Sequence, residues 1–258
     1  MKKEIQKLII EAAYRAGHGH IPSALSILDI IINVYENKSE EDIFILSKGH
    51  GCLALYAYFC YKGVITKEEL FNFGKKGSKL GGHPDRNKLE EIYASTGSLG
   101  HGLPIAVGAA LAKQIKGEKG KVFCLIGDGE ANEGTLWESL LIVSKLKLKN
   151  LVCIIDYNKS QERSLPIQGL SKKLNNFNLN NNPNGDIFIS DVENQFIQEK
   201  NLCKFTDPHA SFIVIVNTIK GEGVKLIEDN VHEWHHKSPT QEEYEKIIKE
   251  LSYEEEVC

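Results

Sequence analysis

Two short polar segments, 127–129 and 156–158, each follow a run of apolar residues typical of a strand buried on both faces of a parallel sheet. The residues between the runs have the spacing of one helix, so we expect a strand, a helix and a second strand. A right-handed crossover places both strand ends at one edge of the sheet, where open α/β sheets bind ligands. Asp128 and Asn158 are then the first polar side chains beyond the two strands, and their oxygens can converge on one ion.

One carboxylate and one amide oxygen form an incomplete metal site. Magnesium commonly fills its remaining octahedral positions with water and phosphate oxygens, so Asp128 and Asn158 predict a magnesium-bound diphosphate. Gly129 allows the backbone to approach such a group, and the amides that open the next helix would face its negative charge. The alternative is an ordinary strand-to-helix turn that happens to contain Asp and Gly. The pairing with Asn158 favours the diphosphate site.

Several histidines lie beside glycine or proline in predicted turns, which present side chains to ligands. Imidazole has an ordinary pKa near ~6.5, so it suits proton transfer to and from hydroxyl oxygens. A single histidine of this kind is more often a surface residue or a hydrogen-bonded structural one. The histidines in turns are His20, His50, His83, His101 and His235 or its neighbour His236.

The rest of the chain supplies the elements that must position these residues. Helical and strand patterns alternate, which predicts an α/β fold: a parallel sheet flanked by helices, in a single domain over residues 1–258. The first helix is expected to carry Ile5, Leu8, Ile9 and Ala12 on one face. A helix between the two strand runs is marked by Leu136, Leu140 and Val143 together with Leu141 and Leu148. The other expected elements are strands at 43–46 and 212–216 and helices at 27–34, 53–61, 104–115 and 242–251.

The pattern weakens between residues 161 and 210, where an asparagine-rich segment at about 171–186 predicts a poorly defined loop or insertion. We assign it no chemistry.

Composition excludes several classes of protein. The net charge of −4 and the ordinary apolar fraction do not favour a nucleic-acid partner. The six cysteines lack metal-ligand spacing and read as reduced thiols, so a cytoplasmic location is expected. The amino terminus leads into an amphipathic helix, with no pattern of a secretory signal or of a membrane span.

The diphosphate motif and several other motifs resemble the amino-terminal half of transketolase, a thiamine-diphosphate enzyme. The resemblance covers nearly the whole chain, most clearly residues 1–161. The matching motifs, in the order of the family, are Gly19–Ser23, Ser47–His50, Gly82–Pro84, Gly97–Gly102, Gly127–Gly134, and Trp234-His235 followed by Lys237.

The resemblance implies that the chain binds thiamine diphosphate and Mg²⁺, and it gives roles to individual residues. His20 and His83 are implied as substrate contacts, and His50 as a contact to the diphosphate. His235 is implied to contact both and to assist catalysis. Glu133 matches a family glutamate at the subunit interface, which communicates with the partner's cofactor-activating glutamate, although the helix dipole alone would also favour a carboxylate there.

The resemblance further implies how the metal and the diphosphate are held. The implied metal ligands are Asp128, Asn158 and the backbone carbonyl of Ser160. The implied cofactor contacts are Gly129, Asn158 and the backbones of Gly97, Ser98 and Leu99.

Thiamine enzymes activate their cofactor with a glutamate on a second, pyrimidine-binding domain, and no second domain of this kind is recognised in the chain. We therefore expect one subunit of a split transketolase, whose carboxy-terminal partner carries that domain, with the two chains forming a heterotetramer. The reaction implied is transfer of a two-carbon ketol unit between sugar phosphates. The chain departs from the family at His101, where glutamine is frequent, and at His236, where glycine is common.

Three other readings stay open at this point. A non-catalytic homologue could keep the cofactor fold as a binding or regulatory subunit, consistent with the departures at His101 and His236. One chain of a 2-oxo acid decarboxylating enzyme or a relative of deoxyxylulose-phosphate synthase would share the diphosphate motif. His232-Glu233-Trp234-His235-His236 matches the HExxH pattern of zinc hydrolases, although the long helix which that pattern requires is not predicted there.

Overall fold

The computed structural model describes residues 1–161, 165, 167, 169–175, 187–197, 201–205 and 211–253. Most of the predicted asparagine-rich segment, residues 176–186, lies outside the described residues. The contacts group the chain into two compact units. Unit 1 comprises Met1–Ile32, Gly49–Ser95 and Ile219–Cys258, and unit 2 comprises Asn33–Lys48 and Thr96–Thr218. The single domain over 1–258 stays a prediction.

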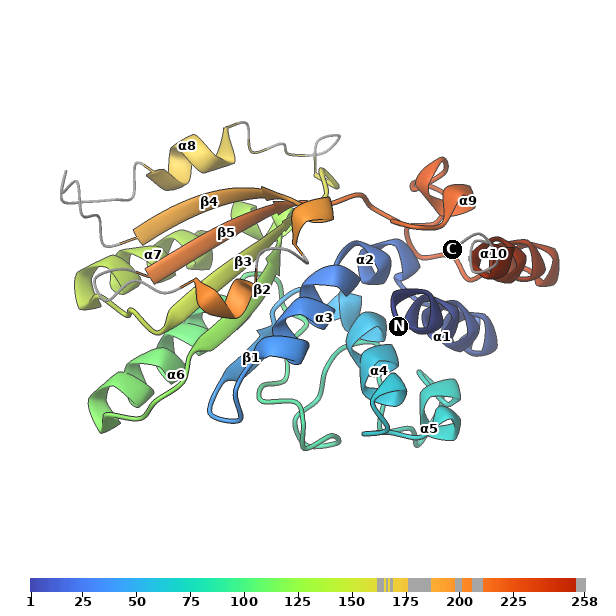
Figure 1. The fold of residues 1–258 in the computed structure, drawn as a ribbon, viewed down its shortest axis with the longest axis horizontal. Helices are drawn as coiled ribbons and strands as arrows, with labels where there is room; N and C mark the ends of the chain where they lie inside the picture. The colour runs from blue at the N-terminus through green and yellow to red at the C-terminus, as the bar shows by residue number, and fades with distance from the viewer. Residues whose placement is uncertain are drawn as a thin grey trace. The chain divides into compact units, whose positions relative to one another are not determined.

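Unit 2 is built on a parallel sheet, as predicted. Within the described residues the sheet has five strands in the order β1-β2-β3-β5-β4, and every neighbouring pair is parallel (Figure 1). The strands are β1 Ile43–Leu46, β2 Val122–Gly127, β3 Leu151–Tyr157, β4 Ile187–Glu193 and β5 Ser211–Asn217.

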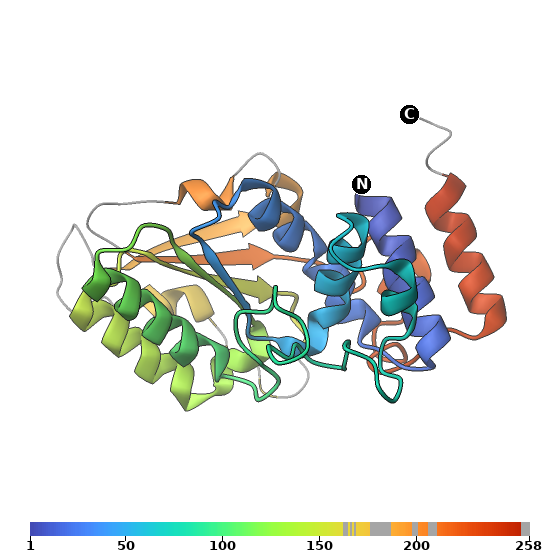
Figure 2. The same ribbon diagram turned by 90° about the horizontal axis from the view of Figure 1, so that it is seen from below.

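Helices cover both faces of this sheet, which explains why its central strands are apolar throughout. β2 is buried along its whole length. In Figure 2, α6 (Gly102–Lys116), α7 (Gly134–Leu146) and α8 (Leu170–Asn175) lie on one face, and the end of α3 (Leu28–Asn37) lies on the other. The short 3₁₀ helix η2 (Asp128–Asn132) connects β2 to α7. Two further 3₁₀ turns are η3 (Asn194–Phe196) and η4 (Leu202–Lys204).

Three details of the prediction were wrong or incomplete. In α1, Ile10 is buried and Leu8 is only half-buried. α7 ends at Leu146, so Leu148 lies beyond it, and Leu141 is exposed by 43% because the buried stripe of the helix runs through Leu136, Leu140 and Val143. The edge strand β4 was not predicted, since it lies in the region where the polar residues interrupt the pattern.

Unit 1 is helical. α1 (Lys2–Ala16) packs against α4 (Cys52–Tyr61) and α10 (Gln241–Tyr253), while α2 (Ile21–Ser26) packs on α1, on α4 and on the 3₁₀ turn η1 (Gly49–Gly51). α5 (Lys67–Phe71) begins with a capping box between Thr66 and Glu69, and α9 (Lys225–Glu228) is short. None of the helices in the described part of the chain is long and apolar enough to cross a membrane.

Two glycines of unit 2 provide a test of this packing. Gly120 has a φ of +87°, and a Cβ there would lie 2.4 Å from the carbonyl oxygen of Glu41, so Gly120→Ala is expected to lower the free energy of unfolding by more than about 1 kcal/mol. Gly108 is an exposed residue of α6 with open space around it, so Gly108→Ala should raise the same free energy by about 0.5–1 kcal/mol. Urea unfolding measures both changes, and equal effects of the two variants would contradict this assignment.

Candidate functional site

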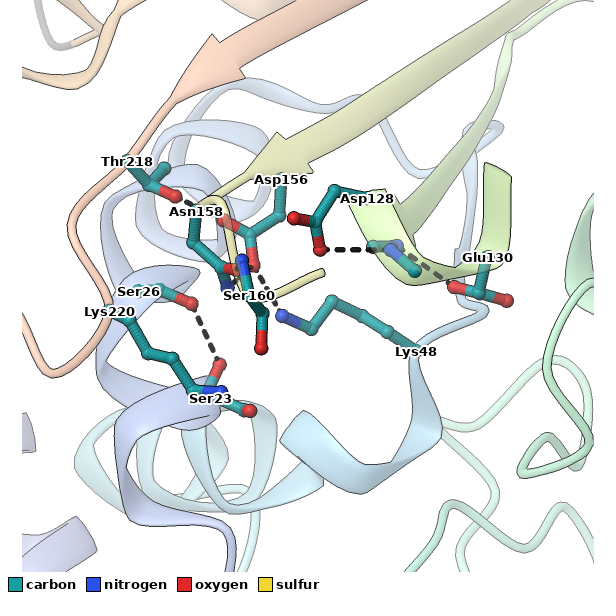
Figure 3. A network of polar contacts seen from close by, with 12 residues as sticks. Ser23, Ser26, Lys48, Asp128, Glu130, Asp156, Asn158, Ser160, Thr218 and Lys220 are labelled. Carbon is teal, nitrogen blue, oxygen red and sulfur yellow. Dashed lines mark hydrogen bonds and ion pairs between the residues drawn. The ribbon is translucent and has the colours of Figure 1, made fainter. Parts of the chain in front are cut away.

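The carboxyl ends of β2 and β3 bring Asp128 and Asn158 into one group, as their spacing predicts. Gly127 at the end of β2 is in register with Asp156 on β3. The Asp128 carboxylate accepts hydrogen bonds from the backbone N–H of Gly129 at 2.9 Å and of Gln161 at 3.4 Å. Figure 3 shows the Asp128 carboxylate beside Asp156 at the strand ends. The turn after β2 and the turn after β3 are therefore tied together at the predicted metal ligand.

The side-chain amide of Asn158 is oriented by its neighbours. Its Nδ2 donates to the Asp156 carboxylate at 2.9 Å, and its Oδ1 accepts from the backbone N–H of Ser160 at 3.0 Å. A carboxylate can only accept, so the amide oxygen must turn away from Asp156. Lys159 between them has a φ of 60°, which produces the tight turn. Asn158 therefore presents an oxygen, the atom that a hard cation requires.

A buried ion pair supports this group, and sequence reasoning missed it. Asp156 is fully buried and Lys48 is 2% exposed, and the Lys48 ammonium is paired with the Asp156 carboxylate. The second carboxylate oxygen accepts a hydrogen bond from the Thr218 hydroxyl. Burying two charges is costly unless both are well paired, so Asp156 depends on these partners. The available signal was a lone carboxylate at the end of an apolar strand run.

Burial raises the pKa of Asp128, and the nearby negative charge of Asp156 raises it further. Hydrogen bonds from Gln161 and Gly129 and the positive charge of Lys48 act in the opposite direction. A divalent cation beside Asp128 would favour the ionised carboxylate. The donors present are a carboxylate, an amide oxygen and a backbone carbonyl, and this oxygen-only set fits Mg²⁺.

Glu130 clamps the segments that surround the predicted diphosphate site. It is 1% exposed, and its carboxylate accepts from the Ser47 hydroxyl at 2.5 Å, from Gly100 N–H at 2.9 Å and from Gly127 N–H at 2.9 Å. Burial raises the pKa of this carboxyl, and the three hydrogen bonds oppose that rise. In Figure 3, Asp128 and Glu130 leave the η2 turn in different directions. Sequence reasoning missed Glu130, because its three partners are separate along the chain.

The loop with the predicted backbone contacts Gly97, Ser98 and Leu99 is anchored at both ends. Before it, the Thr96 hydroxyl donates to the carbonyl of Leu46 at 2.6 Å. After it, the Gly100 carbonyl accepts from the Thr135 hydroxyl at 2.9 Å. The loop itself is mostly exposed, with Leu99 exposed by 37%. The backbone of the loop is thus held in place while remaining open to a ligand.

A side chain is excluded at Gly100, and at Gly129 it would require the side chain of Gln161 to move. Gly100 has a φ of +76°, and a Cβ there would lie 2.5 Å from the Cβ of Glu133. A Cβ on Gly129 would lie 2.7 Å from the amide nitrogen of Gln161. Glu133 is exposed at the residue that precedes α7, with no side-chain cap hydrogen bond. The predicted roles of Gly129 and Glu133 are compatible with these positions and stay predictions.

The predicted histidines form a second group, in unit 1. The ring of His20 lies 5.3 Å from that of His50, 6.0 Å from that of His235 and 4.4 Å from that of His236, measured between centroids. His83 is close enough to influence His20 electrostatically, and its carbonyl accepts a hydrogen bond from the Tyr56 hydroxyl at 3.0 Å.

Burial lowers the pKa of His20 to about 4, with further contributions from His236, His235, His83 and Lys220. The pKa of His235 is also lowered, first by burial and then by Lys220, His236 and His232. Lys220 Nζ lies 3.4 Å from Nδ1 of His235, and because an ammonium only donates, that nitrogen is the acceptor. At neutral pH, His20 and His235 are therefore uncharged.

His101, where the chain departs from the family, lies in unit 2 beside the 97–99 loop. Its Nδ1 lies 2.9 Å from the Leu99 carbonyl and 3.1 Å from the Ser98 hydroxyl. The histidine thus contacts the loop that precedes it.

The geometry does not favour the zinc hydrolase. Residues 231–236 form turns, so His232 and His236 do not share one face of a helix. Within the described residues, no group of three or more His, Cys, Asp or Glu side chains could hold a metal ion. The HExxH match is therefore a coincidence of sequence.

Substitution of Glu130 tests whether its hydrogen bonds to Ser47, Gly100 and Gly127 hold these segments together. Glu130→Gln keeps the shape of the side chain but turns an NH₂ group toward an N–H or O–H donor, so we expect the free energy of unfolding to fall by about 1–3 kcal/mol. The Gly100 amide should also exchange faster with deuterium. The matched control is Glu133→Gln, the same change at an exposed position nearby. Equal stability and equal exchange in the two variants would show that the clamp contributes nothing.

Comparison with known proteins agrees with these observations. Residues 1–178 match the family model described as transketolase, thiamine diphosphate binding domain. The chain is 36% identical to an apulose-4-phosphate transketolase subunit of Actinobacillus succinogenes, over 96% of this chain and 93% of that protein. It is 32% identical to the 6-deoxy-6-sulfo-D-fructose transketolase subunit SqwG of Clostridium sp., over 97% of this chain and 94% of that protein.

Solved structures show the same fold. Transketolase from Campylobacter jejuni superposes with a TM-score of 0.80 at 23% identity, covering 98% of this chain and 42% of the solved chain. The length of this chain is therefore close to that of the two single subunits above, and less than half that of the Campylobacter enzyme. By its sequence and its fold, the chain belongs to the transketolase family, through the thiamine diphosphate binding domain.

Proposed function

We propose that this chain is the amino-terminal subunit of a transketolase that depends on thiamine diphosphate and Mg²⁺. With a carboxy-terminal partner it transfers a two-carbon ketol unit from a ketose phosphate to an aldose phosphate. The observation that carries the proposal is the set of oxygen donors at the ends of β2 and β3, in a chain that belongs to this family.

Asp128, Oδ1 of Asn158 and the carbonyl of Ser160 would hold Mg²⁺. The backbones of Gly129 and of residues 97–99 would contact the diphosphate, and Asp156, through Asn158, keeps one ligand in orientation. The fixed positions of these groups reduce the rearrangement that binding requires.

When bound, thiamine diphosphate supplies the carbanion that attacks the ketose carbonyl. The residues of this chain contribute binding and proton transfer. His20 and His83 would donate hydrogen bonds to substrate hydroxyls and accept them from these groups. His235 would contact the diphosphate and assist proton transfer, and His50 would contact the diphosphate. The uncharged rings of His20 and His235 are suited to these roles, because a neutral imidazole carries one donor and one acceptor.

The partner is proposed from the relatives of the chain. The relatives that match along nearly their whole length include proteins that are each named as one subunit of an apulose-4-phosphate transketolase. We propose that the partner carries the pyrimidine-binding domain with the activating glutamate, that Glu133 lies toward this interface, and that two copies of each chain form a heterotetramer. The cytoplasmic location stays a prediction.

A second function is favoured by His101 and His236, two departures from the family beside residues of the proposed site. In that case the chain is a non-catalytic subunit that binds the cofactor. Binding without turnover in the presence of the partner would distinguish it from the enzyme.

The metal site is tested by Asp128→Ala. Removing the carboxylate should weaken binding of thiamine diphosphate in the presence of Mg²⁺ by at least about 10–100-fold, since even residues outside the ligand shell of a metal have effects of that size. Calorimetric titration of thiamine diphosphate into the complex of the chain and its partner, in the presence of Mg²⁺, measures the affinity for the cofactor. The control Asp191→Ala removes an exposed carboxylate of β4 and should leave the affinity unchanged. Equal affinities of Asp128→Ala and the control would refute the proposed ligand.

Dependence on a partner is tested by reconstitution. The chain alone should show little or no ketol transfer between sugar phosphates, and addition of its carboxy-terminal partner chain should restore transfer in the presence of thiamine diphosphate and Mg²⁺. A coupled assay of the aldose phosphate released from the donor measures the activity of the chain alone and the activity with its partner. Full activity of the chain by itself would rule out the split enzyme.

A further inference from the structure

The histidine group of unit 1 contains one imidazole to which the proposed function gives no role. His236 is exposed, follows the Trp-His pair, and stands where glycine is common in the family. Its ring lies closest to His20, at 4.4 Å between centroids and with the two ring planes at 84°. This edge-to-face contact is a favourable arrangement of two aromatic rings, so it gives the two imidazoles a defined mutual position.

Within the described residues, neither the ring of His20 nor that of His236 makes a hydrogen bond. The two rings come from separate parts of the chain, since His20 precedes α2 and His236 lies in the turns after α9. The pairing therefore forms only when the turns after α9 reach the start of α2. The two rings then offer nitrogens from two segments at one place, and these nitrogens are available to a ligand.

We propose that His236 is a specificity-determining residue that works with His20 and offers a further imidazole to the hydroxyl groups of the sugar. This inference rests on the proposed function and deepens it, because it names the part of the substrate that the two rings recognise. A neutral imidazole has one donor and one acceptor, as a hydroxyl group has, whereas an imidazolium has donors only and favours phosphate.

The charges around His20 support recognition of hydroxyls. The groups that face it are His50 from η1, His83 from the loop after α5, His235 and His236 from the turns after α9, and Lys220. Each positive charge among them opposes protonation of His20. Among the neighbouring side chains, His236 makes the largest contribution to the lowered pKa of His20, after burial itself. Burial, with a further contribution from the pairing with His236, thus favours the uncharged form of His20 that hydroxyl recognition needs.

The direction in which pH changes the charge of His20 follows from its lowered pKa. His20 has a lowered pKa, so it stays uncharged as the pH falls below 6.5 and takes up a proton only near pH 4. Without His236, one source of repulsion is lost, so the pKa of His20 should rise toward 6.5. His20 would then become charged at a higher pH than in the unchanged chain.

The test compares His236→Gln and His236→Gly with the control His232→Gln. His232 lies in the same run of turns and contributes to the shift of His235, but it is not among the groups that shift His20. Long-range ¹H–¹⁵N spectra of the ¹⁵N-histidine chain give the pKa of His20. We expect this pKa to rise in both His236 variants and to stay the same in the control. A His20 that titrates identically in all three variants and the unchanged chain would overturn the inference.

Substrate recognition is measured in the complex with the partner. Loss of one hydrogen bond to a hydroxyl should raise KM for the donor sugar about tenfold in His236→Gly with little change in kcat, and the acid limb of kcat/KM should move to higher pH. The control His232→Gln should leave KM unchanged, because His232 is not among the groups that shift His20. An unchanged KM in His236→Gly would overturn the specificity role.

The outcome can be separated from failure of the proposed function. If the complex shows no ketol transfer at all, the proposed function fails. The inference is then decided by the ring signals of His20 and His236 in the ¹⁵N-labelled chain with its unlabelled partner, on addition of fructose 6-phosphate. Shifts of both signals in the unchanged chain, with loss of the His20 shift in His236→Gly, support it, and a His236 signal that does not shift overturns it.

Discussion

The candidate cofactor site depends on one buried charge, the carboxylate of Asp156. It has no exposure to water, and it is stabilised by the ammonium of Lys48, the hydroxyl of Thr218 and the side-chain amide of Asn158. A buried carboxylate without such partners would be strongly destabilising. Because the amide of Asn158 must donate to it, the Asn158 oxygen is directed elsewhere. The orientation of a proposed metal ligand thus follows from the need to pair a neighbouring charge.

Glu130 is a second buried carboxylate whose hydrogen-bond partners fix the surrounding structure, in this case mainly the backbone. Its carboxylate accepts hydrogen bonds from the end of β1, from the 97–102 loop and from the end of β2, so one buried acid holds three segments together. Gly100 can approach Glu133 closely only because it lacks a side chain. A loop fixed in this way can present its backbone to a diphosphate without being ordered by it, which reduces the entropic cost of binding.

The histidine group of unit 1 differs from these two carboxylates, because the rings of His20 and His235 are kept uncharged. It gathers imidazoles around His20 together with Lys220, and mutual repulsion with burial keeps His20 and His235 uncharged. The acidic group at the strand ends of unit 2 suits a cation, while the uncharged imidazoles suit sugar hydroxyls.

The sequence by itself determined the parallel strands β2 and β3 and the place of Asp128 and Asn158 at their ends, because burial on both faces leaves a continuous apolar run that ends where polar residues begin. It also determined the family, through motifs that are local in the chain. It did not reveal β4, whose polar residues break the strand pattern, or the exposure of Leu141, which depends on what packs against α7. Only the tertiary structure decided which side chains meet. Lys48 and Asp156 are 108 positions apart, and Ser47 and Glu130 are 83 apart. Their pairing arises from the register of the sheet and the packing of the helices, to which no local pattern refers. The hydrophobic periodicity of the sequence indicates whether a residue is buried. Which residue pairs with a buried charge depends on the tertiary structure as a whole.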